Sequence, residues 1–78
     1  MKKLKTRYNA ILIQQEKAVK WFQSEDFHNK FREQGEAFFD RAFARWTMYE
    51  EQRVKILKEL EAQGERITTE QILLGFEL

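Results

Sequence analysis

The sequence predicts an all-α protein that forms one domain over residues 1–78. Three observations support this fold class: the chain has no proline, it has only three glycines, and its apolar residues recur at the three- and four-residue intervals of a helix. β-sandwiches and barrels need turn residues roughly every 8–12 positions, and this chain has too few of them. Because 42% of the residues are hydrophobic and 35% are charged, a disordered chain is not expected either.

A first amphipathic helix is predicted over residues 3–22. Placed at about 100° per residue around a helix axis, one sector of about 120° contains Leu4, Tyr8, Ile11, Leu12, Gln15, Ala18, Val19 and Phe22. Most of these residues step by four and three positions alternately, as in the contact seam of paired helices. Gln15 is the polar exception on this seam. Ser24, which two acidic residues follow, predicts an N-cap and therefore a break before the next helix.

A second, much longer helix is predicted over residues 25–63. Its apolar stripe keeps its angular phase on both sides of Gly35, so an unbroken helix is the simpler interpretation despite the roughly 1 kcal/mol cost of an internal glycine. Gly64 follows where a C-terminal cap glycine is expected. The alternative is a break at Gly35 into helices over residues 25–34 and 36–63, which would pack as a monomeric three-helix bundle.

A short third helix is predicted over residues 69–75. Thr68 and Gln71 have the spacing of a capping box, in which each side chain hydrogen-bonds the backbone of the other residue. The helix is apolar enough to fold back on the long helix or to dock on a neighbouring subunit.

The difference in helix length predicts self-association. The first helix would be about 30 Å long and the second about 58 Å, so the first cannot cover the whole aromatic stripe of the second. A domain this small is marginally stable, and a chain with no cysteine and one histidine has little access to disulfides or metals. We therefore expect a helical hairpin that associates into an antiparallel dimeric bundle. The expected interface residues are Phe31, Phe38, Phe39, Phe43, Trp46 and Tyr49.

The sequence contains few residues of the types that usually carry out catalysis. With no cysteine, one serine at a predicted cap and one histidine, we expect no enzyme, no catalytic residue and no cofactor. Glu25 and His28 have the Glu-x-x-His spacing of half a carboxylate di-iron ligand set. They lie in the first turn of a helix, however, and a polar helix start is the favoured interpretation, so no metal site is predicted.

Positive charge gathers near the amino end, where residues 1–22 contain six lysines and arginines and a single acid. One broad face of the first helix carries Lys2, Lys3, Lys17 and Lys20 together with Trp21. Four interpretations remain open: a solvated face, a surface for an acidic protein partner, a surface for nucleic acid with Trp21 available for stacking, and a membrane-surface contact.

Arg53 interrupts the apolar stripe of the long helix near its centre. The first interpretation is an ion pair that fixes the register of the bundle, with Glu50 or an acid of a second chain as its partner. The second is an anion contact in a binding groove, and the third is a side chain that extends from the edge of the stripe into solvent.

Together these patterns predict a soluble, cytoplasmic, non-enzymatic interaction protein. It would act as a regulator, adaptor or inhibitor by docking on another macromolecule, most simply a protein, with no membrane and no small-molecule substrate. The alternative is a nucleic-acid-binding accessory protein that uses the basic face of the first helix. The candidate binding residues are Lys2, Lys3, Lys17, Lys20, Trp21 and Arg53.

Overall fold

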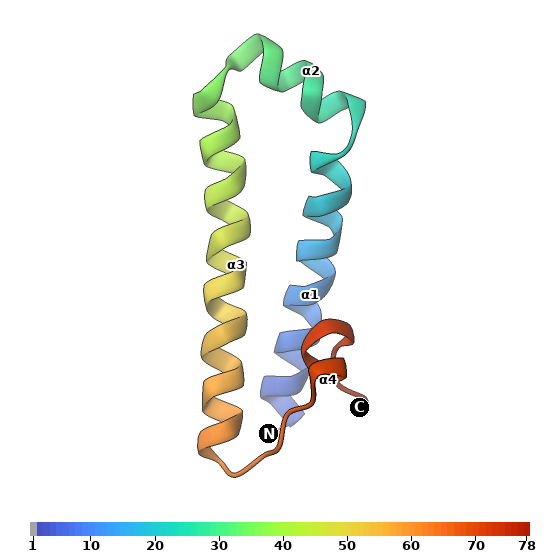
Figure 1. Cartoon of the computed structure of the whole chain (residues 1–78), viewed down its shortest axis with the longest axis vertical. Coiled ribbons are helices and arrows are strands. Elements are labelled where there is room, and N and C mark those ends of the chain that lie inside the picture. The colour runs from blue at the N-terminus through green and yellow to red at the C-terminus, as the bar shows by residue number, and fades with distance from the viewer. Residues whose placement is uncertain (1) are drawn as a thin grey trace.

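The computed structural model describes residues 2–78 and consists of four helices. Helices α1 (Lys2–Phe22) and α3 (Glu36–Ala62) form an antiparallel hairpin, α2 (Glu25–Gln34) crosses one end of it, and α4 (Thr69–Leu74) lies near the other end (Figure 1). The all-α prediction is confirmed. The molecule is elongated, with extents of 48 × 19 × 19 Å. None of the helices in residues 2–78 is both long enough and apolar enough to cross a lipid bilayer.

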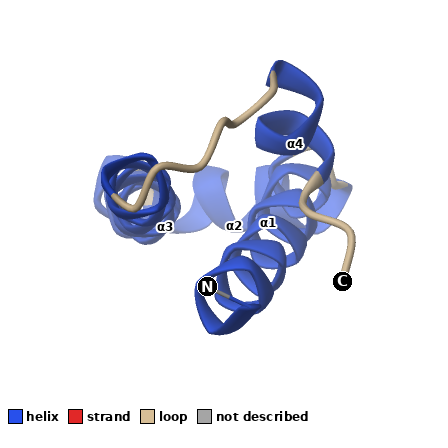
Figure 2. Ribbon diagram, turned by 90° about the horizontal axis from the view of Figure 1, so that it is seen from below, coloured by secondary structure: helices blue, strands red, loops and turns tan. Residues whose placement is uncertain are grey.

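The hydrophobic core lies in the half of the hairpin that is next to α4. It joins residues of α1 and α3 to one residue beyond α4, and its buried members are Tyr8, Ile11, Leu12, Ile56, Leu60 and Phe76. The α1 residues of this core come from the apolar sector predicted from the sequence. Viewed along the hairpin, α4 lies beside α1 on one side of the plane that contains α1 and α3 (Figure 2).

The prediction of an unbroken helix over residues 25–63 is wrong, because the chain breaks at Gly35. This residue has φ 75° and ψ −161°, a backbone conformation that essentially only glycine adopts without strain. The alternative considered above, a break between residues 34 and 36, is the one that the structure shows. Apolar periodicity could not decide between the two, because aromatic residues on both sides of the break, Phe27 of α2 and Phe38 of α3, pack against Trp21 of α1.

The break lets α2 close the end of the hairpin. Phe27 of α2 is only 5% exposed, and its ring centroid lies 4.9 Å from that of Trp21, 5.1 Å from that of Phe22 and 5.5 Å from that of Phe38. A helix continuing straight through Gly35 would carry Phe27 away from α1 and into solvent. Burial of this ring therefore favours the bend.

The predicted caps at the starts of α2 and α4 are confirmed. The Ser24 hydroxyl accepts a hydrogen bond from the backbone N–H of Phe27 at 3.2 Å. Thr68 and Gln71 form both hydrogen bonds of the capping box. Such caps satisfy backbone groups that have no partner within the helix, so they fix where each helix begins.

The segment after α4 folds back on α1 of the same chain. The Asn9 side chain donates to the Phe76 carbonyl at 2.8 Å and accepts from the Phe76 N–H at 2.7 Å. The Phe76 ring packs edge-on against Tyr8, with ring centroids 5.3 Å apart. Lys5 forms an ion pair with Glu65, at 2.9 Å, and thereby also ties the linker before α4 to α1. These contacts complete the core within one chain.

Replacing Gly35 tests the role of the bend. Gly35→Ala should lower the free energy of unfolding by about 1–3 kcal/mol, because alanine is strained at this φ and ψ. Urea denaturation followed by circular dichroism measures this change. The matched control is Gln34→Ala at the neighbouring exposed position, which should change stability by less than about 0.5 kcal/mol. Equal stability of the glycine variant and the native chain would contradict a required bend.

Candidate interaction surfaces

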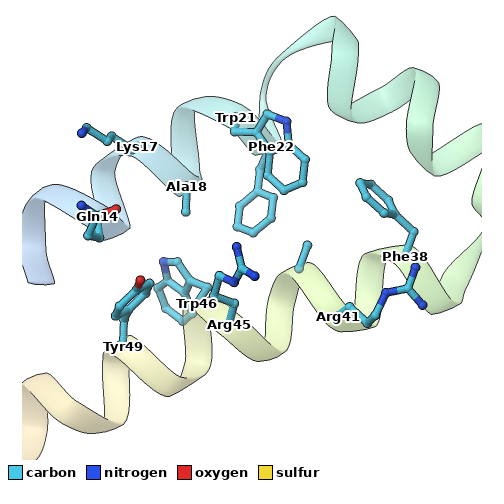
Figure 3. A pocket seen from close by; sticks show the side chains of 11 residues that line it. Gln14, Lys17, Ala18, Trp21, Phe22, Phe38, Arg41, Arg45, Trp46 and Tyr49 are labelled. Carbon is cyan, nitrogen blue, oxygen red and sulfur yellow. The ribbon is translucent and has the colours of Figure 1, made fainter.

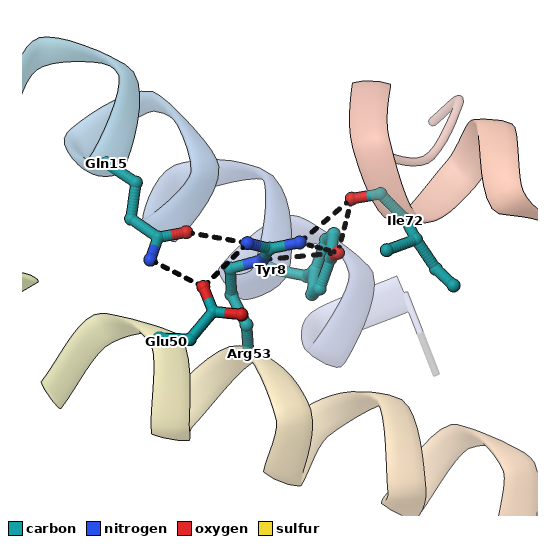
Figure 4. Close-up of polar contacts among 5 residues, drawn as sticks. All are labelled: Tyr8, Gln15, Glu50, Arg53 and Ile72. Atoms are coloured by element: carbon teal, nitrogen blue, oxygen red, sulfur yellow. Dashed lines mark hydrogen bonds and ion pairs between the residues drawn. The ribbon is translucent and has the colours of Figure 1, made fainter. Parts of the chain in front are cut away.

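Arg53 of α3 is the centre of a polar cluster that joins three helices, and we call this cluster the Arg53 clamp (Figure 4). Its guanidinium donates to Gln15 Oε1 and Glu50 Oε2, both at 2.9 Å. It also donates to the Tyr8 hydroxyl, at 3.0 and 3.3 Å, and to the Ile72 carbonyl at 3.1 Å. These bonds use every N–H group of the guanidinium. The predicted pair of Arg53 with Glu50 is confirmed, with only 14% of the Arg53 side chain exposed.

The other members of the clamp also bond to one another. The Tyr8 hydroxyl donates to the Ile72 carbonyl at 2.6 Å, and the Gln15 amide donates to Glu50 at 2.9 Å. Gln15 is buried, and it is the polar residue that the sequence places on the apolar seam. Its amide is therefore satisfied within the clamp. Since no guanidinium N–H is left for a ligand, the structure places Arg53 inside the fold and not in an open anion site.

A groove of about 440 Å³ opens between α1 and α3 in the half of the hairpin next to α2 (Figure 3). The two helices are thinly packed here, since small residues such as Ala18 and Ala42 lie on their facing sides. Phe22 and Arg45 point from opposite helices into the space between them. The residues that line the groove are Gln14, Lys17, Ala18, Trp21, Phe22, Phe38, Arg41, Ala42, Arg45, Trp46 and Tyr49.

All charged residues of this groove are basic, so we call it the cationic groove. Lys17 lies on α1, and Arg41 and Arg45 lie on α3 one helical turn apart. All three are exposed, and within residues 2–78 none has a carboxylate within 4.0 Å. No acidic residue lines the groove in the part of the chain that the structure describes. Three cations without a carboxylate partner therefore border the same groove, and of these Arg45 points into the space between the helices.

The predicted basic face of α1 does not form one cluster. Lys17 borders the cationic groove, whereas Lys2 and Lys3 are exposed near the start of α1, at least 14 residues or about 21 Å away. Lys20 is exposed and borders a different hollow, on the side of α4. A nucleic-acid surface made of all four lysines would therefore have to run along the whole helix.

Trp21 is not the freely exposed aromatic residue that the sequence suggested. It is half-buried because α2 folds over the end of α1. Phe27 and Phe38 pack edge-on against its indole, with ring centroids 4.9 and 5.7 Å away, and Phe22 lies at 5.9 Å. One side of the Trp21 ring still borders the cationic groove.

The six aromatic residues predicted at an interface lie on two surfaces, and Trp46 borders both. Phe38 and Tyr49 are half-buried and line the cationic groove. The other four form a row of neighbouring rings with centroids about 6 Å apart, here called the aromatic ladder: Phe31, Phe39, Phe43 and Trp46. Phe39 and Phe43 are 41% and 50% exposed. The sequence did not separate these two directions, and pairing through these six residues stays a prediction.

Arg41 and Arg45 were missed by the sequence reasoning. Their only signal is that they stand four residues apart at the edge of the apolar stripe, with Ala42 between them. Many solvated arginines have this spacing on a helix surface. Their importance depends on where α1 places Lys17 and Trp21, and that is a property of the tertiary fold.

Glu25 and His28 lie exposed in the first turn of α2. The His28 ring rests near Phe27, with centroids 6.1 Å apart. Nowhere in residues 2–78 do three His, Asp or Glu side chains gather closely enough to hold a metal ion.

No family model, curated protein or solved structure matches this chain. Its function is therefore argued from the geometry and charge of its surfaces.

Removing one hydroxyl tests the Arg53 clamp. Tyr8→Phe should lower the free energy of unfolding by about 1–3 kcal/mol, because it leaves two guanidinium N–H groups without their acceptor and removes one of the two hydrogen bonds to the Ile72 carbonyl. Hydrogen exchange should accelerate most in α4, which this hydroxyl ties to α1. Thr6→Ala is the control, since its exposed hydroxyl bonds only within α1 and its loss should cost less than about 0.5 kcal/mol. Unchanged exchange in α4 would show that the hydroxyl does not hold this helix.

Proposed function

We propose that this chain is a non-enzymatic helical interaction protein that acts as a regulator, adaptor or inhibitor by docking on another macromolecule. It does so as an antiparallel homodimer that pairs along the aromatic ladder and leaves the cationic groove free. The observation that carries this proposal is the uncovered apolar surface on the α4 side of the hairpin.

The uncovered surface begins where α4 ends. With only six residues, α4 covers the half of the hairpin that contains Tyr8 and leaves the other half open. A shallow hollow there is bordered by Val19, Trp46 and Leu73, and Val19 and Leu73 are themselves exposed. Together with the aromatic ladder they form an apolar face of the kind that marks protein interfaces.

The total surface supports a second copy as the occupant of this face. A compact monomer of this mass exposes about 5,000 Å², whereas this chain exposes 6137 Å². The excess is about 1,100 Å² by this scaling, which exceeds the roughly 800 Å² that each partner contributes to a standard interface. One dimer contact of ordinary size would therefore bring the exposed surface per chain to that of a compact protein.

The two surfaces lie on different sides of α3, so pairing and docking are compatible. Phe43 and Arg45 are two residues apart, which on a helix separates their directions by about 160°. A two-fold axis near Phe39 and Phe43 would place the two ladders against each other and make a four-helix bundle. The cationic groove of each copy then faces outward.

Nucleic-acid binding is the second candidate. The observation that favours it is the position of Lys17, Arg41 and Arg45 beside two indoles, since cations and aromatic rings together bind single strands. The separation of Lys2 and Lys3 from this group, and the rings packed around Trp21, favour a protein partner instead.

Disrupting the aromatic ladder tests the dimer. The native chain should have twice the 9.5 kDa mass of one chain in multi-angle light scattering at micromolar concentration. The double variant Phe39→Gln/Phe43→Gln should have the mass of one chain and keep its helical circular dichroism, because both rings are exposed in a single copy. The control is Met48→Gln, an equally exposed apolar residue (48%) that α3 directs away from the ladder. A native mass of 9.5 kDa, or a ladder variant that stays paired, would contradict the proposed dimer.

A further inference from the structure

We infer that the cationic groove binds an acidic amphipathic helix of a partner protein, which packs as a third helix against α1 and α3. This inference names the chemistry of the partner. It does not depend on pairing along the aromatic ladder, because all residues of the groove come from one chain.

The shape of the groove suits a helix. Its walls are two antiparallel helices, with residues 14–22 on α1 and residues 38–49 on α3. At about 1.5 Å per residue these walls are about 12 and 17 Å long, or roughly two to three helical turns. The ring cluster around Phe27 closes one end. Amphipathic helices bind such grooves through apolar side chains at i, i+3, i+4 and i+7.

The floor of the groove supplies the apolar contact. Phe22, Phe38 and Trp46 are half-buried within the hairpin and still border the open space. A cavity of about 440 Å³ has room for a few large apolar side chains of a docked helix. Aromatic residues of this kind carry much of the binding free energy at protein interfaces.

The rims of the groove select the charge of the partner. Arg41 and Arg45 stand one turn apart on one rim, which matches carboxylates spaced by four residues on a docked helix. Lys17 stands on the other rim and matches an acid on the opposite flank of that helix. Because the three cations lack carboxylate partners within residues 2–78, an acidic helix gains ion pairs without breaking existing ones. The lysines of a lysine-rich helix are repelled by the same three cations.

The surroundings of Trp21 favour a protein over a nucleic acid. Base stacking needs a free aromatic face, but three phenylalanine rings already surround Trp21. The cations stand on two facing rims and not along one continuous strip, so they follow the flanks of a helix better than a phosphate backbone.

Three fluorescent probes test this inference by anisotropy at about 150 mM salt, where long-range steering is screened. The first is a synthetic helix of about 18 residues with leucines at helical spacing and glutamates on both flanks. The second replaces every glutamate by lysine, and the third is a thymidine oligonucleotide. We expect the glutamate helix to bind at least about tenfold more tightly than either of the others.

Charge reversal locates the site. Arg41→Glu/Arg45→Glu should weaken binding of the glutamate helix by about tenfold or more, and Lys17→Glu on the other rim should weaken it independently. The control is Lys55→Glu/Lys58→Glu, which makes the same change in net charge on α3 but outside the groove. It should alter affinity by less than about twofold. Circular dichroism checks that every variant folds, as expected for substitutions at exposed positions.

Each outcome supports or overturns the acidic-helix site. Equal binding of the glutamate and lysine helices, no binding of either, or an equal loss in the Lys55/Lys58 control would overturn it. Tighter binding of the oligonucleotide would assign the groove to nucleic acid instead. The variant Phe39→Gln/Phe43→Gln should still bind the glutamate helix. The proposed dimer and the proposed binding site in the groove are therefore tested independently of each other.

Discussion

The fold depends on one guanidinium. Arg53 hydrogen-bonds α1 through Tyr8 and Gln15, its own helix through Glu50, and α4 through the Ile72 carbonyl. Sliding α1 against α3 by one turn, about 5.4 Å, would separate Arg53 from Tyr8 and Gln15. The pair with Glu50 lies within α3 and would remain, but buried N–H groups of the guanidinium would lose their acceptors, which is destabilising. We infer that the Arg53 clamp fixes the register of the hairpin, which leucine and isoleucine contacts alone would specify less strictly.

That register also determines the two surfaces. With α1 held against α3, the alanines of the groove half fall on facing sides of the helices and cannot fill the space between them, so a groove remains. Helical geometry then directs Arg41 and Arg45 toward the groove and Phe39 and Phe43 toward the side of α4. One constraint in the core thus separates a charged surface from an apolar one on the same helix.

Structural features that depend on residues close together in the chain could be predicted from the sequence. The apolar face of α1, the caps at Ser24 and Thr68, and the pair of Arg53 with Glu50 all follow from spacings of a few residues. The bend at Gly35 was only the alternative prediction, because the aromatic periodicity continues across it. The burial of Trp21 and the position of Lys17 across the groove from Arg41 depend on long-range packing, which no local spacing encodes.

Packing is uneven along the hairpin, and this has a thermodynamic consequence. Leu60 and Tyr8 are fully buried in the half next to α4, whereas the groove half is held mainly by the ring cluster around Phe27. Local opening follows the density of buried apolar contacts, so the groove half is the part that opens first. A partner that binds only the closed groove stabilises that half against opening by its binding free energy. Docking and local folding then form a single coupled equilibrium.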